Sequence, residues 1–273
     1  MTLKQAYDEI ARFIEKHNIK IDSFEVVNEV DKYRNYWKPE KTNVILLAES
    51  HVFTSDDDFD KKIDYSRFKD LIPNYPDGYV RFVYCLGYSE YSLLKNLPHD
   101  KRVYKRGTPQ YWEIFSACAS KSEQFNFDGI LKTKTRNDFY RIRDKIGLLR
   151  KLKEMGVWLV DSSIVGLYRS GEKKPSHKIM SEIILISWDN YIRDLVQNSK
   201  PKCIICVGKF VGKVLKNNLN QIKIPFFVQP QPQARLSAKE KYEVFKKYQK
   251  ICSEYRPCTT AGDIKTLKSF SIK

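Results

Sequence analysis

The 273-residue sequence contains 42% hydrophobic and 13% aromatic residues, enough to bury a core, which excludes a wholly disordered chain. Its 49 Lys and Arg residues outnumber 33 Asp and Glu residues and leave a formal net charge of +16. This excess suits a polyanionic partner such as DNA, because each neutralised phosphate releases condensed counterions. A basic surface without a nucleic-acid role is the alternative.

Several protein classes are disfavoured by the sequence. No stretch approaches the ~18 apolar residues of a membrane span, and residues 1–17 lack the apolar core of a signal peptide. Cys203 and Cys206 have the spacing of half a metal site, but they lie in an apolar run typical of a buried strand. We therefore expect a cytoplasmic monomer with reduced thiols, no membrane association, no metal and no cofactor.

In the first part of the chain, helical spacing of apolar residues predicts a helix over 3–17. The aromatic-rich segment 30–42 is interpreted as a linker. The continuous apolar run 44–49 predicts a buried parallel strand. Residues 54–78 predict a long loop with one helical turn, and residues 79–87 either a further strand or a buried segment.

The rest of the chain alternates between helical patterns and short apolar runs. We expect helices over 110–120, 142–155, 182–199 and 209–219, and a proline-containing turn that enters a further helix over 231–251. We expect strands over 157–163, 201–208 and 224–229, and a basic tail without pattern over 253–273. This alternation predicts an α/β fold, a three-layer α/β/α sandwich around a central, mainly parallel four-stranded sheet. We expect one domain over 1–273, with an N-terminal helix within 1–20 and a core over about 40–250.

Polar residues follow each predicted strand. Ligands bind outside the carboxyl ends of parallel strands, so these residues should converge on one site. They are Glu49 and Ser50, Asp161 and Ser162, Gly208 and Lys209, and Gln229 and Gln231.

The same strand ends resemble the motifs of the uracil-DNA glycosylase superfamily. NVILLAESHVF stands where the family has Gly-Gln-Asp-Pro-Tyr-His, and GVWLVDSSIVGLYRSGEKKPSH is similar to its Gly-Val-Leu-Leu-Leu-Asn strand with a basic loop ending in Ser-His. PKCIICVGKFVGKVL resembles the strand and helix that follow, and VQPQPQARLSA resembles the His-Pro-Ser-Pro motif. The resemblance covers roughly residues 40–245, and every motif is degenerate.

The resemblance implies catalytic roles for three residues. A glycosylase flips a base out of the duplex, stabilises the sugar cation with a carboxylate, and places a donor beside the departing base. Ser50 replaces the family Asp, so Glu49 is the nearest substitute, with the Asp56–Asp58 triplet as an alternative that is more typical of a solvated loop. Gln229 replaces the family His as donor, and Asp161 replaces the base-reading Asn.

Two residues at the strand ends, Val52 and Asp161, indicate a modified cytosine as the substrate. Val52 replaces the family Tyr that blocks substituents at C5 of the pyrimidine, so the resemblance implies room for a substituent there. An ionised Asp161 only accepts hydrogen bonds, which suits the exocyclic amine of cytosine. The alternative for Asp161 is a turn or helix cap beside Ser162.

The resemblance also indicates pocket and DNA-contacting residues. Ser50, His51 and Val52 would line the base pocket, and Phe53, Tyr84 or Tyr88 would stack on the base. DNA contacts are expected from Lys173, Lys174, Ser176, His177, Lys209, Gln231, Gln233 and Arg235. The exposed basic residues among them are equally compatible with ordinary surface.

The sequence thus predicts a monofunctional DNA glycosylase that removes a C5-substituted cytosine, such as the hydroxymethyl- or glucosylated hydroxymethylcytosine of phage DNA, with an antiviral role. The alternatives are a glycosylase for uracil or damaged bases, and an inactive DNA-binding module of the same fold. An unrelated α/β hydrolase or nuclease has no supporting motif in the sequence.

Overall fold

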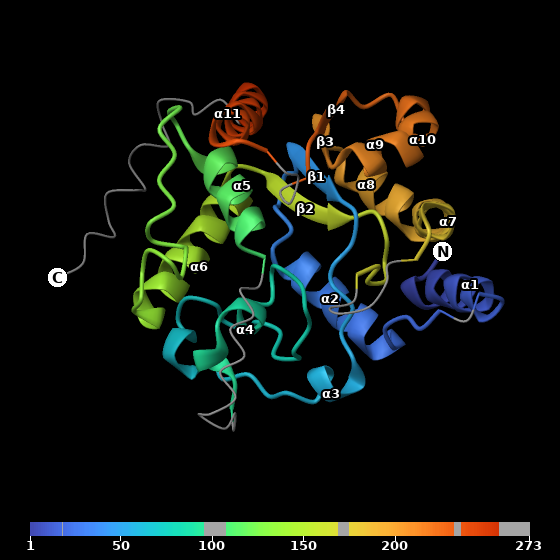
Figure 1. The fold of residues 1–273 in the computed structure, drawn as a ribbon, viewed down its shortest axis with the longest axis horizontal. Coiled ribbons are helices and arrows are strands. Elements are labelled where there is room, and N and C mark those ends of the chain that lie inside the picture. The colour runs from blue at the N-terminus through green and yellow to red at the C-terminus, as the bar shows by residue number, and fades with distance from the viewer. Residues whose placement is uncertain (18, 96–107, 169–174, 232–235, 257–273) are drawn as a thin grey trace.

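A four-stranded parallel sheet forms the centre of the protein (Figure 1). The computed structural model describes residues 1–17, 19–95, 108–168, 175–231 and 236–256. All strand pairs within these residues are parallel, and the strand order is β2-β1-β3-β4. The strands are β1 (Val44–Ala48), β2 (Val157–Asp161), β3 (Cys203–Val207) and β4 (Phe226–Gln229). The expected α/β fold is confirmed.

Burial on both faces explains why the strands read as continuous apolar runs. Every residue of β1, β2 and β3 is buried, whereas β4 at the sheet edge leaves Val228 exposed. Cys203 and Cys206 lie inside β3 as unpaired thiols, and burial raises the pKa of each to about 12. They behave as small apolar residues.

Helices cover the sheet on both sides (Figure 1). On one side α5 packs against both α6 and α11, and α6 also contacts β2; on the other side α9 contacts β3 and β4, and α7 packs against α1 and α9. The first group is α5 (Pro109–Ala119), α6 (Asp138–Glu154) and α11 (Ala238–Glu254). The second group is α1 (Leu3–Glu15), α7 (His177–Ser187), a π-helical turn (Trp188–Ile192), α8 (Arg193–Ser199), α9 (Lys209–Val214) and α10 (Lys216–Gln221).

The linker prediction for residues 30–42 is wrong, because helix α2 spans Phe24–Tyr36. Tyr33 and Arg34 of α2 are buried, and the Trp158 indole of β2 donates a hydrogen bond to the Arg34 carbonyl at 2.9 Å. The aromatic residues that suggested a linker are therefore the packing face of a helix.

The segment between β1 and α5 consists mostly of irregular backbone. Residues 79–87 form a buried segment rather than a strand. The short elements here are α3 (Asp56–Phe59), α4 (Leu86–Ser89) and the 3₁₀ turns Ser66–Phe68 and Tyr91–Leu93. No helix among the described residues is both long and apolar enough to cross a membrane.

Candidate active site

The carboxyl ends of β1 and β2 place two carboxylates side by side. Ala48 of β1 pairs with Asp161 of β2, so Glu49 emerges next to Asp161 at the same sheet edge. Ser162 donates its backbone N–H to the Ala48 carbonyl (2.7 Å), and Ser163 donates its own to the Glu49 carbonyl (3.0 Å). These bonds continue the strand pairing beyond the sheet and fix the relative position of the two acids.

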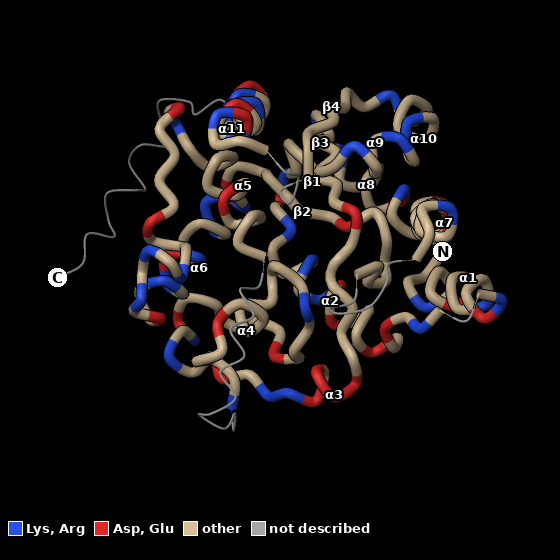
Figure 2. The backbone as a smooth tube through the Cα atoms, viewed as in Figure 1, with Lys and Arg blue, Asp and Glu red and all other residues tan. Residues whose placement is uncertain are grey.

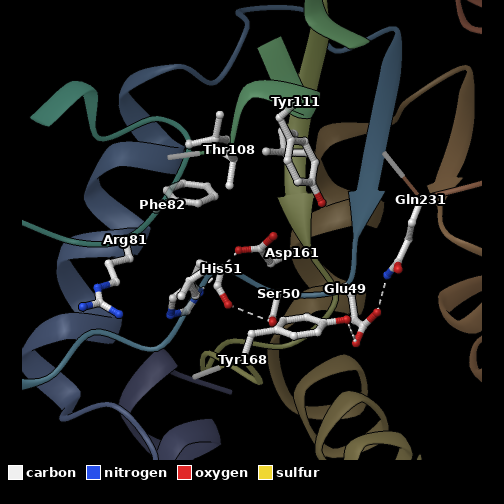
Figure 3. Close-up of a pocket in the computed structure, with 13 residues that line it drawn as sticks. Glu49, Ser50, His51, Arg81, Phe82, Thr108, Tyr111, Asp161, Tyr168 and Gln231 are labelled. Carbon is white, nitrogen blue, oxygen red and sulfur yellow. Dashed lines mark hydrogen bonds and ion pairs between the residues drawn. The ribbon is translucent and has the colours of Figure 1, made fainter. Parts of the chain in front are cut away.

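Both carboxylates line one cavity of about 260 Å³ (Figure 3). In Figure 3 Glu49 and Gln231 lie on one side of the cavity and Arg81 on the opposite side, with His51 and Asp161 between them. The cavity is lined by Glu49, Ser50, His51, Val52, Arg81, Phe82, Val83, Thr108, Tyr111, Leu159, Asp161, Tyr168 and Gln231.

Glu49 is buried and held by two neutral donors. The Tyr168 hydroxyl donates to its Oε1, and the Gln231 amide Nε2 donates to its Oε2. Burial and the charge of Glu49 raise the pKa of Tyr168 well above its usual value, which keeps Tyr168 a donor. Among the described residues no cation lies within ion-pair distance of Glu49, so this part of the chain orients its carboxylate without neutralising it.

Gln231 reaches Glu49 by crossing the end of β3 at Gly208. The Gly208 N–H donates to the Gln229 carbonyl at 2.8 Å, which anchors the end of β4. A Cβ on Gly208 would lie 2.6 Å from Cγ of Gln231, and the φ of Gly208 is +125°. Glycine is therefore required both for the backbone conformation and for the passage of the Gln231 side chain.

His51 lies between two carboxylates in the cavity wall. Its Nε2 is 3.2 Å from Asp22 Oδ2 and its Nδ1 is 3.4 Å from Asp161 Oδ2, and its side chain has no exposed surface. Burial lowers the pKa of His51, but the two carboxylates, Asp161 and Asp22, outweigh burial and raise it to about 9. The imidazole is therefore charged at neutral pH.

Asp22 accepts hydrogen bonds from both of the loops that follow β1 and β2. Its Oδ1 accepts the Thr54 N–H at 2.7 Å, and its Oδ2 accepts the Gly166 N–H at 2.5 Å. Gly166 packs so closely that a Cβ there would lie 2.5 Å from the backbone nitrogen of Phe53. Ser50 links the same loops, because its hydroxyl accepts the Leu167 N–H at 3.1 Å.

The opposite wall combines a guanidinium with aromatic rings. Arg81 Nη2 pairs with Asp58 of α3, while its buried Nε has no hydrogen-bond partner among the described residues. Asp56 and Asp57 are exposed, so no member of that triplet lines the cavity. Phe82 and Tyr111 add aromatic surface to the cavity, which Val52 also lines.

Six of the residues singled out in the sequence share this cavity. They are Glu49, Ser50, His51, Val52, Asp161 and Gln231. Gln229 does not line it, because β4 lies at the sheet edge with β3 between it and β1. Gln231, predicted as a strand-end residue and a DNA contact rather than as a catalytic group, occupies the place beside Glu49.

The stacking candidates require correction, since Phe53, Tyr84 and Tyr88 do not line the cavity. Tyr84 is buried behind β2, where its hydroxyl accepts the Leu159 N–H at 2.9 Å. Phe53 is buried, and its backbone packs closely against Gly166. The rings that do face the cavity belong to Phe82, Tyr111 and Tyr168.

The predicted DNA-contacting residues are only partly described. Ser176 caps α7 by accepting the Ile179 N–H (3.4 Å), and the ring of His177 lies 5.1 Å from that of Phe210. Lys209 is exposed at the first position of α9. Lys173, Lys174, Gln233 and Arg235 lie outside the described residues.

Sequence reasoning missed Asp22, Arg81, Tyr111 and Tyr168. Tyr168 stands in the basic loop of the segment GVWLVDSSIVGLYRSGEKKPSH. Arg81 and Phe82 stand in the buried segment 79–87, from which Tyr84 was predicted to stack on the base. Asp22 precedes helix α2 and carries no sequence pattern that distinguishes it from a helix cap. Only tertiary packing brings these residues to the strand ends.

Comparison with known proteins assigns the chain to no family. No protein-family model matches its sequence, and no curated protein matches it. Within the part of the chain that the structure describes, no cluster of three or more His, Cys, Asp or Glu side chains has the arrangement of a metal site. Functional inference therefore depends on the cavity.

Proposed function

We propose that the protein is a DNA glycosylase of the uracil-DNA glycosylase superfamily that removes a C5-substituted cytosine and leaves an abasic site. The observation that carries the proposal is the meeting of Glu49 and Asp161, from adjacent strand ends, in one cavity. The parallel α/β sheet is the fold that the resemblance implies. Phage hydroxymethylcytosine and its glucosylated form are the candidate substrates, with an antiviral role in the cytoplasm.

Glu49 is the proposed catalytic carboxylate. Cleavage of the N-glycosidic bond sends the electron pair to the base and builds positive charge on the sugar, while water supplies the new bond at C1′. A fixed carboxylate without a counter-cation stabilises that charge or orients the water. Glu49 has this character, because Tyr168 and Gln231 orient it without cancelling its charge. The donor role that the sequence assigned to Gln229 passes to Gln231.

The middle and far side of the cavity suit the base and its substituent. Asp161 accepts an amine donor at the base edge, and Phe82 or Tyr111 offers a ring for stacking. The Val52 N–H donates to the Arg81 carbonyl at 3.1 Å, so Arg81 borders the position that the resemblance places against C5. Arg81 also lines the cavity, and its buried Nε has no hydrogen-bond partner among the described residues, so this donor would suit a substituent with acceptor oxygens, as hydroxymethyl and glucosyl groups have.

The proposal is tested with duplexes that carry cytosine, uracil, 5-hydroxymethylcytosine or its glucosylated form, followed by alkaline cleavage at abasic sites. We expect strand breaks with the modified cytosines, and a loss of about 100-fold or more in Glu49→Gln, because the charge that stabilises the sugar cation is removed. Asp56→Asn is the matched control, since Asp56 is an exposed carboxylate outside the cavity.

The alternatives give different results in the same assay. Breaks with uracil alone would indicate a uracil glycosylase and remove the argument from Val52 and Asp161. DNA binding without breaks in any duplex would indicate an inactive DNA-binding module, for which the replacement of the family Asp by Ser50 is the supporting observation.

A further inference from the structure

The line of charged groups Asp22, His51 and Asp161 extends from the protein interior to the cavity. Asp22 is buried and does not line the cavity, His51 lies between the two acids, and Asp161 borders the cavity. Figure 3 shows the Asp161 carboxylate between His51 and Tyr111. The groups that face the imidazole are therefore Asp22 from the segment before α2, Asp161 from β2, and the edge of the Phe82 ring with centroids 6.2 Å apart.

The geometry fits an imidazolium ion. Each ring nitrogen of His51 faces a carboxylate oxygen, at 3.2 Å for Nε2 and 3.4 Å for Nδ1. A neutral imidazole has one nitrogen that only accepts, and that nitrogen would face a second acceptor. In the imidazolium both nitrogens donate, so both contacts become attractive. The raised pKa of His51, about 9, agrees with this reading.

Asp22 has an anchoring role that Asp161 lacks. The carboxylate of Asp22 accepts the backbone N–H groups of Thr54 and Gly166, which hold it in place. Asp161 Oδ2 is a buried acceptor without a hydrogen-bond partner among the described residues, because its 3.4 Å contact with His51 is an ion pair whose geometry falls short of a hydrogen bond. A buried acceptor of this kind is costly unless a ligand supplies a donor.

We propose that Asp22 and His51 are positioning residues that hold Asp161 as an ionised acceptor, so that the cavity selects a pyrimidine with an exocyclic amine over one with a carbonyl. This inference rests on the proposed function and deepens it, because it assigns the source of base selectivity. A protonated Asp161 would carry an O–H donor, which could donate a hydrogen bond to the O4 carbonyl of a uracil-type base, so such a base would bind equally well. A neighbouring cation favours the ionised form of a carboxyl and so removes that option.

The test uses the purified full-length chain and two free bases, 5-hydroxymethylcytosine and 5-hydroxymethyluracil, titrated by calorimetry at pH 7. The two probes differ at C4, which carries an amine or a carbonyl, and at N3, which is an acceptor in the first base and an N–H donor in the second. We expect the wild-type protein to bind the amine base about tenfold or more tightly, since a buried acceptor facing a carbonyl is left unpaired. In His51→Gln the preference should shrink to about threefold or less, because the cation is lost.

A second variant covers the case in which His51→Gln does not fold. Asp22→Asn alters the interior carboxylate without changing the residues that line the cavity, and it should reduce the preference in the same direction. Glu29→Gln is the matched control, because Glu29 is also a buried carboxylate that accepts a backbone N–H, from Gly78 at 3.0 Å, and it does not line the cavity. Thermal unfolding verifies that each variant is folded.

A direct measurement of the imidazole needs no ligand. In protein with ¹⁵N-labelled histidine, the His51 ring, assigned by its loss in His51→Gln among four histidines, should stay doubly protonated up to a pH of about 9. A ring that titrates near its ordinary value overturns the inference. Equal binding of the two bases, binding of neither, or an undiminished preference in both variants overturns it too. If base preference follows the prediction but no duplex is cleaved, the proposed function alone fails.

Discussion

Glu49 and Glu90 show how two buried acids in one protein are suited to different tasks. Glu90 pairs with Arg141 and Lys145, and these contacts outweigh burial and lower the pKa of Glu90. Its charge is neutralised, so it stabilises the fold around α6. Among the described residues Glu49 receives hydrogen bonds from the neutral groups of Tyr168 and Gln231 and pairs with no cation, which leaves its charge available to a cation in the cavity. This difference separates a candidate catalytic acid from a structural one.

Protonation of His51 should make the stability of the protein depend on pH. The folded pKa of His51 is about 9 and the ordinary value is 6.5, so the folded state holds its proton more tightly than the unfolded state. The resulting stabilisation, of the order of 3 kcal/mol, is fully present below pH 6.5 and is lost as pH rises through 9. Chemical denaturation from pH 6 to 9.5 measures it.

Lys145 requires a control in that experiment. Burial lowers the pKa of Lys145 to about 8, although Glu90 opposes this, so its contribution to the free energy of unfolding increases above pH 8. The difference between wild type and His51→Gln cancels this contribution, because Lys145 is unchanged in both. A difference that stays constant with pH would show that folding does not raise the pKa of His51.

At the scale of elements, Gly208 controls how the segment after β4 reaches the site. In Gly208→Ala the positive φ should cost of the order of 1–3 kcal/mol, and the new Cβ should push Gln231 away from Glu49. Because small displacements of a catalytic group are costly, we expect base excision to fall by up to about 100-fold. Denaturation and the abasic-site assay measure the two effects separately.

Gly147→Ala is the matched substitution for that experiment. Gly147 is exposed within α6, and a Cβ there would meet nothing within 4 Å. The substitution Gly147→Ala should stabilise the protein by about 0.5–1 kcal/mol and leave base excision unchanged. If Gly208→Ala lowers stability but not excision, the contact between Gln231 and Glu49 is dispensable for catalysis.

The elements also show which parts of the architecture the sequence could predict. The strands were predictable because burial on both faces requires continuous apolar runs such as 44–48. Glu49 and Asp161 followed from them, since parallel strands end at one sheet edge. Helix α2 was not predictable in this way, because buried Glu29 and Arg34 interrupt its apolar periodicity. Asp22, Arg81 and Tyr168 come from irregular segments whose placement depends on the whole fold.

At the scale of the whole molecule, the formal charge of +16 should govern how the proposed DNA partner binds. Lys and Arg residues occur over α1, α6, α10 and α11 rather than on one element (Figure 2). We therefore expect the charge of the whole molecule to attract DNA. Residues at the carboxyl edge of the sheet should determine how the bound DNA is oriented on the protein. Lys202 and Lys209 separate these contributions, because both are exposed and they flank the two ends of β3.

The slope of log affinity against log salt concentration measures the number of phosphates that a protein neutralises, at about 0.9 per phosphate. Lys209→Ala should reduce the magnitude of this slope by about 1, because Lys209 lies at the cavity end of β3. Lys202→Ala removes the same charge at the opposite end of that strand and should leave the slope unchanged. Fluorescence anisotropy with a short duplex at several salt concentrations provides the measurement. Equal effects of the two substitutions would show that DNA does not approach through the carboxyl edge, and the cavity would then lie outside the DNA-binding face.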